Sequence, residues 1–220
     1  MNYSTSEENY IKAIYHLQQE HHLVTTNALS NELDTRPASV TDMLKKLKQK
    51  KLLHYEKYKG FSLTALGNQV ALGIIRRHRL WEYFLVDKLL FTWDEVHEVA
   101  EELEHVTSRK LVDRLDEFLG FPTVDPHGDP IPDKNGNIVK TRQVALPDLP
   151  LNRSAPVCSV GDQSTDMLEL LRHYKIKLGT VIQIKKVFRF DNSMEVAVAN
   201  QDTIIISEQV AKNLFVKYEG

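Results

Sequence analysis

The first 64 residues carry three helical patterns and then a hairpin pattern, an order that few small folds share. Apolar residues recur at helical spacing from Ser4 to Gln19. Thr25 or Thr26 can cap a second, shorter helix that ends at Leu33. Pro37 suits the first turn of a third helix. The apolar stripe of this third helix comprises Val40, Met43, Leu44 and Leu47.

A short, aromatic segment from Leu52 to Thr64 has the pattern of two strands, with a turn at Tyr58 to Gly60. Three helices and a hairpin, with a turn of roughly three to four residues before the third helix, are the elements of a winged helix-turn-helix. We therefore expect a mainly α-helical protein in which residues 1–65 form a DNA-binding domain of this type.

The rest of the chain divides at a proline-rich stretch. Helical patterns continue from Ala65 to about Leu119, and most of the prolines then lie between Pro122 and Pro156, as in a loop or linker. Beyond it, one helical pattern and several short apolar segments are typical of a small antiparallel β-barrel. The expected organisation is a helical domain with a proline-rich loop over residues 66–148 and a barrel domain over residues 149–220.

Charge is distributed unevenly although the formal net charge is only −2. The stretch from Arg36 to Gly60 has eight basic and two acidic residues, whereas the stretch from Asp94 to Glu117 has nine acidic and three basic ones. The basic stretch fits an anionic partner such as DNA, and the acidic stretch fits a cation. Solvated helix faces are the alternative interpretation of both stretches.

Composition excludes several other classes of protein. The chain has 42% hydrophobic and 26% charged residues, as ordinary globular proteins do, and its single cysteine, Cys158, permits no intrachain disulfide. No stretch approaches the ~18 apolar residues of a membrane helix, and the first residues lack the pattern of a secretion signal. We expect a cytoplasmic protein without a membrane partner.

Two groups of histidine and carboxylate residues are candidate metal ligands. His78 and Glu82 are four residues apart and share a helix face, and a second set combines His97, Glu101, Glu104 and His105 at helical spacing. Imidazole and carboxylate ligands without a thiolate favour Mn²⁺ or Fe²⁺, although Zn²⁺ can bind in vitro. Ion pairs on a helix surface are the alternative.

No catalytic motif accompanies these ligands. The segment from His97 to Glu101 nearly matches the zinc-protease motif, but Glu101 stands where that motif requires a second histidine. A phosphate loop, a dinucleotide fingerprint and a nucleophile elbow are also missing from the sequence. We therefore expect no enzyme and no catalytic residues, and a metalloenzyme that activates water is the more distant alternative.

The residues best placed to contact DNA lie on the third helix and on the hairpin turn. Residues near the start of a recognition helix reach base edges and phosphates. The helix candidates are Arg36, Ser39, Thr41, Asp42, Lys45 and Lys46, and the wing candidates are Lys57, Tyr58 and Lys59. A soluble, lysine-rich helix without a DNA partner is the alternative.

Five segments in this order resemble the diphtheria toxin repressor family over nearly the whole chain. They are Glu8-Asn-Tyr-Ile, Val40-Thr-Asp-Met-Leu-Lys-Lys-Leu, His78-Arg-Leu-Trp-Glu, Leu103-Glu-His-Val-Thr-Ser and Asp125-Pro-His-Gly-Asp-Pro-Ile-Pro. The resemblance implies a cytosolic, homodimeric, metal-dependent transcriptional regulator. It also implies that residues 66–148 carry dimerisation and metal binding, and that residues 149–220 form an SH3-like domain.

The resemblance implies two metal sites. One would use His78, Glu82 and His97 together with Asp162 of the C-terminal domain. The other would use Asn9, Glu101, Glu104 and His105, joined in some members by the loop pair Asp125 and His127. Iron-sensing members have Met in place of Asn9 and Cys in place of Glu101, whereas manganese-sensing members have carboxylates, so Glu101 favours Mn²⁺ over Fe²⁺.

The expected function is therefore that of a Mn²⁺-dependent, or alternatively Fe²⁺-dependent, repressor. It would bind double-stranded DNA at a palindromic operator as a homodimer and control genes of metal-ion uptake and homeostasis. A winged-helix regulator that ignores metal, with its His and Glu residues in ion pairs, is the principal alternative.

Overall fold

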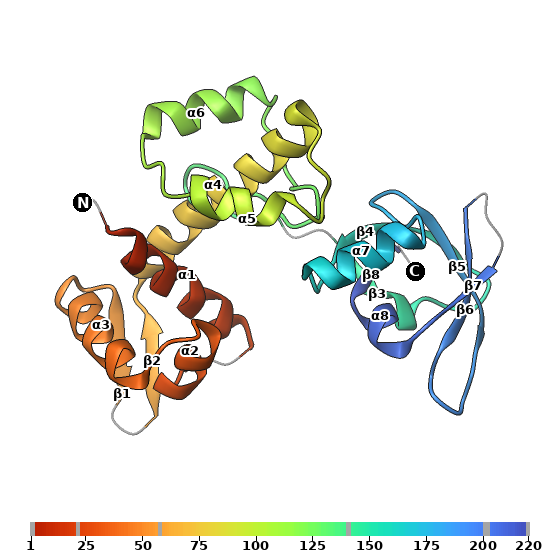
Figure 1. The fold of residues 1–220 in the computed structure, drawn as a ribbon, viewed down its shortest axis with the longest axis horizontal. Coiled ribbons are helices and arrows are strands. Elements are labelled where there is room, and N and C mark those ends of the chain that lie inside the picture. The colour runs from red at the N-terminus through yellow and green to blue at the C-terminus, as the bar shows by residue number, and fades with distance from the viewer. Residues whose placement is uncertain (1–2, 21–22, 57–58, 140–141, 200–202, 219–220) are drawn as a thin grey trace. The chain divides into compact units, whose positions relative to one another are not determined.

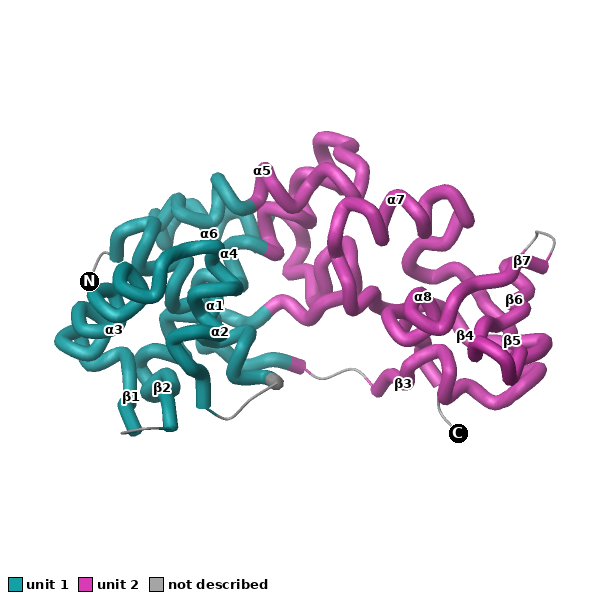
Figure 2. Tube along the Cα trace, turned by 60° about the horizontal axis from the view of Figure 1, so that its bottom comes forward, with its two compact units in different colours: residues 1–78, 101–118, 132–138 teal, residues 79–100, 119–131, 139–220 magenta. Residues whose placement is uncertain are grey.

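A computed structural model describes residues 3–20, 23–56, 59–139, 142–199 and 203–218 (Figure 1). The chain divides into two compact units, coloured separately in Figure 2. The first unit comprises residues 1–78, 101–118 and 132–138, and the second comprises residues 79–100, 119–131 and 139–220. None of the helices in the described part of the chain combines the length and the apolar character that a membrane crossing needs.

The first unit begins with the predicted helices and hairpin. Its elements are α1 (Thr5–Glu20), α2 (Thr26–Glu32), α3 (Pro37–Gln49), β1 (Leu53–Glu56) and β2 (Gly60–Leu63). Thr25 caps α2, since its hydroxyl oxygen accepts a hydrogen bond from the backbone N–H of Ala28. The two strands pair antiparallel, with Leu53 opposite Leu63, and Phe61 is buried against the helices. The winged helix-turn-helix expected from the sequence is confirmed.

Three more helices follow the hairpin: α4 (Ala65–Leu89), α5 (Val96–Leu103) and α6 (Arg109–Phe118). Helix α4 begins in the first unit and ends in the second, and α5 crosses the same boundary after Ala100. The helical pattern of residues 65–119 is interrupted at Leu90, whose φ of 59° is left-handed and cannot continue a helix. This break at Leu90 lets the chain change direction between α4 and α5, so that the two helices can present side chains to each other.

The C-terminal part of the second unit is a six-stranded antiparallel sheet with the order β3-β8-β4-β5-β6-β7. The strands are β3 (Val144–Ala145), β4 (Ser154–Val160), β5 (Val181–Val187), β6 (Met194–Val198), β7 (Thr203–Ile206) and β8 (Leu214–Val216). The helices η1 (Leu146–Asp148), α7 (Thr165–His173) and α8 (Glu208–Lys212) complete this domain. The expected small barrel is an open sheet in the described residues, where no pairing joins β3 to β7.

The proline-rich stretch is more structured than a linker. It holds a turn over residues 123–130, strand β3, helix η1 and the start of β4. Leu146 and Leu149 are buried in the core of the C-terminal domain, because β3 pairs with the distant strand β8. The loop of residues 119–131 belongs to the second unit together with the end of α4, and these two segments carry the candidate ligands Glu82, Asp125 and His127.

Candidate metal centre

Histidine and carboxylate side chains gather in two groups, which we name after one residue each. The Glu82 cluster consists of Glu82, Asp125 and His127, and the His78 cluster consists of His78, His97 and Glu101. Within each cluster the candidate ligand atoms all lie within 4.8 Å of one another. Each cluster therefore offers three ligand atoms from groups that metal ions commonly use.

The Glu82 cluster is fully enclosed by protein. Glu82 on α4 is 1% exposed, Asp125 is 3% exposed and His127 is 0% exposed. His127 Nε2 lies 2.8 Å from the backbone oxygen of Trp93, which can only accept a hydrogen bond, so Nε2 carries the proton. His127 Nδ1 is buried without a hydrogen-bond partner among the described residues, 3.8 Å from Glu82 Oε2. A buried imidazole nitrogen is thus aimed at a carboxylate.

The turn that carries His127 is organised around Asp125. Asp125 Oδ1 accepts hydrogen bonds from the backbone N–H groups of His127 at 2.8 Å and Asp129 at 2.9 Å. Its other oxygen lies 3.4 Å from Arg79 Nε, and the same guanidinium forms an ion pair with Asp129 at 2.7 Å. Arg79 on α4 therefore holds the loop in place while leaving Asp125 close to Glu82.

Both loop residues titrate abnormally because they are buried together. Burial, followed by the negative charges of Glu82 and Asp129, raises the pKa of Asp125 from 3.8 to about 7. Burial acts to lower the pKa of His127, but the neighbouring Glu82 and Asp125 outweigh it and raise that pKa. The cluster therefore favours a bound proton in the absence of another cation.

These features fit a divalent metal ion. An imidazole nitrogen without a partner and two buried carboxylates form a nitrogen and oxygen donor set of the kind that Mn²⁺ and Fe²⁺ accept. The hydrogen bond from His127 to the Trp93 carbonyl is of the kind that orients metal-binding histidines.

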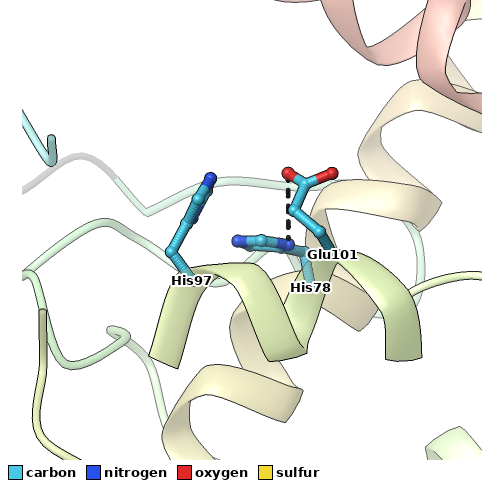
Figure 3. Close-up of side chains that lie close together, drawn as sticks. All are labelled: His78, His97 and Glu101. Carbon is cyan, nitrogen blue, oxygen red and sulfur yellow. Dashed lines mark ion pairs between the residues drawn. The ribbon is translucent and has the colours of Figure 1, made fainter. Parts of the chain in front are cut away.

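The His78 cluster is assembled from α4 and α5 (Figure 3). His97 and Glu101 lie one turn apart on α5, and His78 Nδ1 is 3.9 Å from Glu101 Oε1. His97 Nδ1 is also 3.2 Å from Glu82 Oε1, so His97 contacts the other cluster as well. The side chain of His97 is 45% exposed, and this cluster is therefore more accessible to solvent than the Glu82 cluster.

Glu104 lies just after α5 and is 0% exposed. Its Oε2 atom is 2.8 Å from His78 Nδ1 and 2.7 Å from the ammonium nitrogen of Lys12 on α1. Its Oε1 atom is buried without a hydrogen-bond partner in the described part of the chain. Burial acts to raise the pKa of Glu104, but the hydrogen bond from His78 and the charge of Lys12 outweigh it and lower that pKa.

Two charged residues of α1, which sequence reasoning missed, contact this region. Glu8 Oε2 is 2.7 Å from His105 Nδ1, and Glu8 Oε1 accepts a hydrogen bond from Arg77 at 2.7 Å. Lys12 Nζ is 2.5 Å from Glu101 Oε1. The neighbouring Asn9 Oδ1 is buried without a partner among residues that the structure describes. The four-residue spacing of Glu8 and Lys12, which places both on one helix face, is the signal that could have identified them.

The structure groups the ten predicted ligands differently from the sequence analysis. His78 and Glu82 fall into different clusters, and Asp125 and His127 join Glu82 instead of Asn9 and Glu101. Asp162 belongs to neither cluster, and its Oδ1 atom accepts a hydrogen bond from the backbone N–H of Ser164. The roles of all ten residues as metal ligands stay predictions.

The predicted DNA-contacting side chains on the third helix are all exposed. These residues are Arg36, Ser39, Thr41, Asp42, Lys45 and Lys46. Lys45 forms an ion pair with Asp42 at 3.0 Å, and the exposed Lys59 of the hairpin turn forms one with Glu56 at 3.3 Å. The remaining wing candidates, Lys57 and Tyr58, lie outside the described residues.

Three family models match successive parts of the chain. Residues 2–61 match the N-terminal DNA-binding domain of iron-dependent repressors, and residues 64–133 match the metal-binding and dimerisation domain of the same proteins. Residues 144–218 match the FeoA domain. Together these models cover nearly all of the sequence in the order that the fold presents.

Individual relatives agree with these matches. The iron-dependent repressor IdeR of Mycobacterium leprae is 30% identical over 169 residues, which is 74% of this chain and 73% of the relative. The transcriptional regulator MntR of Oceanobacillus iheyensis is 35% identical over 117 residues, or 53% of this chain and 78% of the relative.

A solved structure of a manganese-dependent transcriptional repressor in complex with manganese has the same fold. It superposes with a TM-score of 0.86 at 30% identity, covering 97% of this chain and all of the other. The named relatives are transcriptional regulators and not enzymes. This chain therefore belongs to the family of metal-dependent transcriptional repressors.

Proposed function

We propose that this chain is a Mn²⁺-dependent repressor that binds a palindromic operator as a homodimer and controls genes of metal-ion uptake. The observation that carries the proposal is the Glu82 cluster, where a buried imidazole nitrogen without a hydrogen-bond partner faces two buried carboxylates. A buried imidazole nitrogen without a partner, next to two buried carboxylates, is costly unless a ligand or a proton compensates it.

The donor atoms favour manganese. Both clusters contain only imidazole nitrogens and carboxylate oxygens, and the sole cysteine, Cys158, belongs to neither. Carboxylate ligands suit Mn²⁺, whereas thiolates favour softer ions. Fe²⁺ is the alternative physiological ion, and Zn²⁺ is expected to bind in vitro because of its higher intrinsic affinity.

We assign Glu82, Asp125 and His127 to one metal site, and His78, His97 and Glu101 to another. A bound divalent cation would supply positive charge that allows these carboxylates to stay ionised together. Asp125 and His127 lie on a loop that Arg79 anchors to α4, so the loop presents its ligands to Glu82. In the metal-free protein, the raised pKa values of Asp125 and His127 favour a proton bound within the Glu82 cluster.

Metal can change DNA binding only if its ligands come together better in one conformation than in another. The ligands of the two clusters come from α4, α5 and the loop of residues 119–131, so their capture would order these segments. Because α4 directly follows the hairpin of the DNA-binding domain, its ordering can reach the wing.

The proposed division of labour follows the matched domains. Residues 1–65 would contact DNA through the exposed side chains of α3 and the hairpin turn. Residues 66–148 would bind metal and form the dimer. Residues 149–220 would support the metal-binding loop, since the backbone N–H of Val160 at the end of β4 donates a hydrogen bond to the His127 carbonyl at 3.0 Å.

Selection of genomic DNA fragments by the purified protein tests the proposal. The selection is run at physiological salt, once with Mn²⁺ and once with a chelator, because affinity for DNA depends steeply on ionic strength. We expect a palindromic site to be retained only with Mn²⁺. Retention under both conditions would indicate a winged-helix regulator that ignores metal, and retention under neither would contradict DNA binding.

Two variants connect this result to the Glu82 cluster. Asp125→Asn removes one carboxylate and is expected to abolish retention of the palindromic site in the presence of Mn²⁺. Glu117→Gln, which removes an exposed carboxylate of α6 that is paired with Arg114, is the matched control and should select the same fragments as the wild-type protein. An unchanged Mn²⁺ response of Asp125→Asn would refute the assignment of this site.

A further inference from the structure

A lysine side chain occupies the position next to Glu101 and Glu104 where a cation is expected. Lys12 Nζ lies 2.5 Å from Glu101 Oε1 and 2.7 Å from Glu104 Oε2. The Lys12 side chain is only 14% exposed, although lysine is rarely buried without a partner. One ammonium group therefore bridges two carboxylates on α5 and immediately after it.

The charges around Lys12 nearly balance without a metal ion. Three carboxylates, those of Glu8, Glu101 and Glu104, meet two permanent cations, Lys12 and Arg77. Adding a divalent ion while Lys12 stays in place would bring two positive groups against the same carboxylate oxygens of Glu101 and Glu104. Like charges at this range repel strongly in a poorly hydrated environment. Lys12 and a metal ion are therefore competitors for Glu101 and Glu104.

Lys12 and Arg77 differ in how easily each can move away from the carboxylates that it contacts. Arg77 is fixed at two points, by Glu8 Oε1 and by the backbone oxygen of Glu104. Among the described residues, Lys12 is held by the two carboxylates that a metal ion would take, and its four-carbon stem lets the ammonium group turn toward solvent. Release of Lys12 can thus accompany metal capture without moving a helix.

The ammonium group satisfies Glu104 incompletely. Oε2 contacts both Lys12 and His78, whereas Oε1 is buried without a hydrogen-bond partner in the described residues and lies 3.8 Å from His105 Nε2. A buried carboxylate oxygen without a partner is unfavourable. Glu104 is therefore open to a further ligand, although Lys12 occupies its other oxygen.

We propose that the Lys12 ammonium group is a tethered cation that competes with the metal ion for Glu101 and Glu104 and raises the metal concentration at which they are captured. Lys12 also links α1 to these residues when no metal is bound. This inference rests on the proposed function for the nature of the ion, Mn²⁺, but concerns a residue that belongs to neither metal cluster.

Mn²⁺ binding by the full-length protein tests the competition directly. The variant is Lys12→Met, which keeps the length of the side chain and removes its charge. Electron paramagnetic resonance of free Mn²⁺ gives the number of bound ions and their dissociation constants at fixed pH and salt. We expect Lys12→Met to bind Mn²⁺ at least tenfold more tightly, or to bind one more ion per chain than the wild-type protein.

Two further variants separate competition from a general effect of charge. Lys12→Arg keeps the charge and should bind Mn²⁺ as the wild-type protein does. Lys50→Met removes another lysine that contacts α1, where Lys50 Nζ lies 2.6 Å from Glu7 Oε1, and should also leave Mn²⁺ binding unchanged. If Lys12→Met is poorly folded by circular dichroism, Lys12→Gln, which retains a hydrogen-bond donor, replaces it with the same expectation.

Equal or weaker Mn²⁺ binding by the neutral Lys12 variants would overturn the inference, because a removed competitor must increase affinity. The proposed function is judged separately, by whether the wild-type protein selects DNA differently with Mn²⁺ and with chelator. A protein that ignores Mn²⁺ in DNA selection but binds it more tightly after Lys12→Met would sustain the competition and refute the repressor mechanism.

Discussion

His127 donates its Nε2 proton to the backbone carbonyl of Trp93, 2.8 Å away, and this bond determines where the other ring nitrogen points. The two rings also stack, with their planes inclined by 18°. Nδ1 is consequently turned toward Glu82 and Asp125. The hydrogen bond to the Trp93 carbonyl thus orients a nitrogen ligand.

His127→Gln should weaken Mn²⁺ binding at the Glu82 cluster at least tenfold, because an amide is a poorer ligand than an imidazole held in this orientation. Equilibrium dialysis followed by metal analysis measures the change. His173→Gln, which replaces an exposed histidine on α7, is the control and should bind Mn²⁺ normally. Unchanged Mn²⁺ affinity of His127→Gln would remove His127 from the ligand set.

The metal-free protein should lose stability as pH rises, because Asp125 has a higher pKa in the folded chain than in the unfolded one. The stabilising contribution is fully present below 3.8 and is lost as pH rises through about 7. The raised pKa of His127 acts in the same direction. Thermal unfolding in the presence of a chelator, measured from pH 4 upward, should therefore show a falling free energy of unfolding.

Asp125→Asn should flatten this dependence and stabilise the metal-free protein near neutral pH by on the order of 1 to 3 kcal/mol, since a buried neutral amide replaces a group that must ionise. The amide oxygen can still accept the backbone hydrogen bonds from His127 and Asp129. The same variant should bind Mn²⁺ weakly, so stability and metal binding move in opposite directions. An identical pH slope in both proteins would show that Asp125 is not the titrating group.

The sequence was sufficient to predict the winged helix-turn-helix, because its signals are local. Pro37 begins α3, and Thr25 caps α2, as their side-chain chemistry requires. Strands β3 and β8 were missed for the opposite reason. Each is at most three residues long, and Val144 pairs with Val216 across most of the C-terminal domain, so neither strand is recognisable without its partner.

The residue types of the candidate site were predictable, but their grouping was not. His78 and Glu82 share a face of α4, yet His78 groups with two residues of α5 and Glu82 with two residues of the loop 119–131, which depends on tertiary packing. Likewise, Glu8 and Asn9 are adjacent in sequence and point in directions about 100° apart on α1. Glu8, and not Asn9, contacts His105 because of where His105 lies in the folded chain.

Lys46→Ala should weaken DNA binding to a similar extent for all sequences, because an exposed lysine on α3 is placed to contact phosphate. The slope of log affinity against log salt should decrease by about 1 for each phosphate contact that is lost, and a dimer presents two copies of Lys46. Fluorescence anisotropy at several salt concentrations measures this slope. Lys110→Ala, which removes an exposed lysine of α6, should leave it unchanged, and an unchanged slope for Lys46→Ala would exclude this contact.

Gly128 links the metal-binding loop to the C-terminal sheet, and its replacement tests whether that sheet supports the metal site. Its φ of 90° favours glycine, and a Cβ atom there would collide with the backbone oxygen of Cys158 on β4. Gly128→Ala should therefore displace the neighbouring His127 and weaken Mn²⁺ binding by about 10- to 100-fold, as loss of supporting contacts typically does. Gly120→Ala is the matched control, because Gly120 also has a positive φ, of 75°, but a Cβ atom there meets no atom within 4 Å. If calorimetry gives both variants the same Mn²⁺ affinity, backbone strain alone explains any loss of affinity relative to the wild-type protein. The contact with β4 then does not position the ligands.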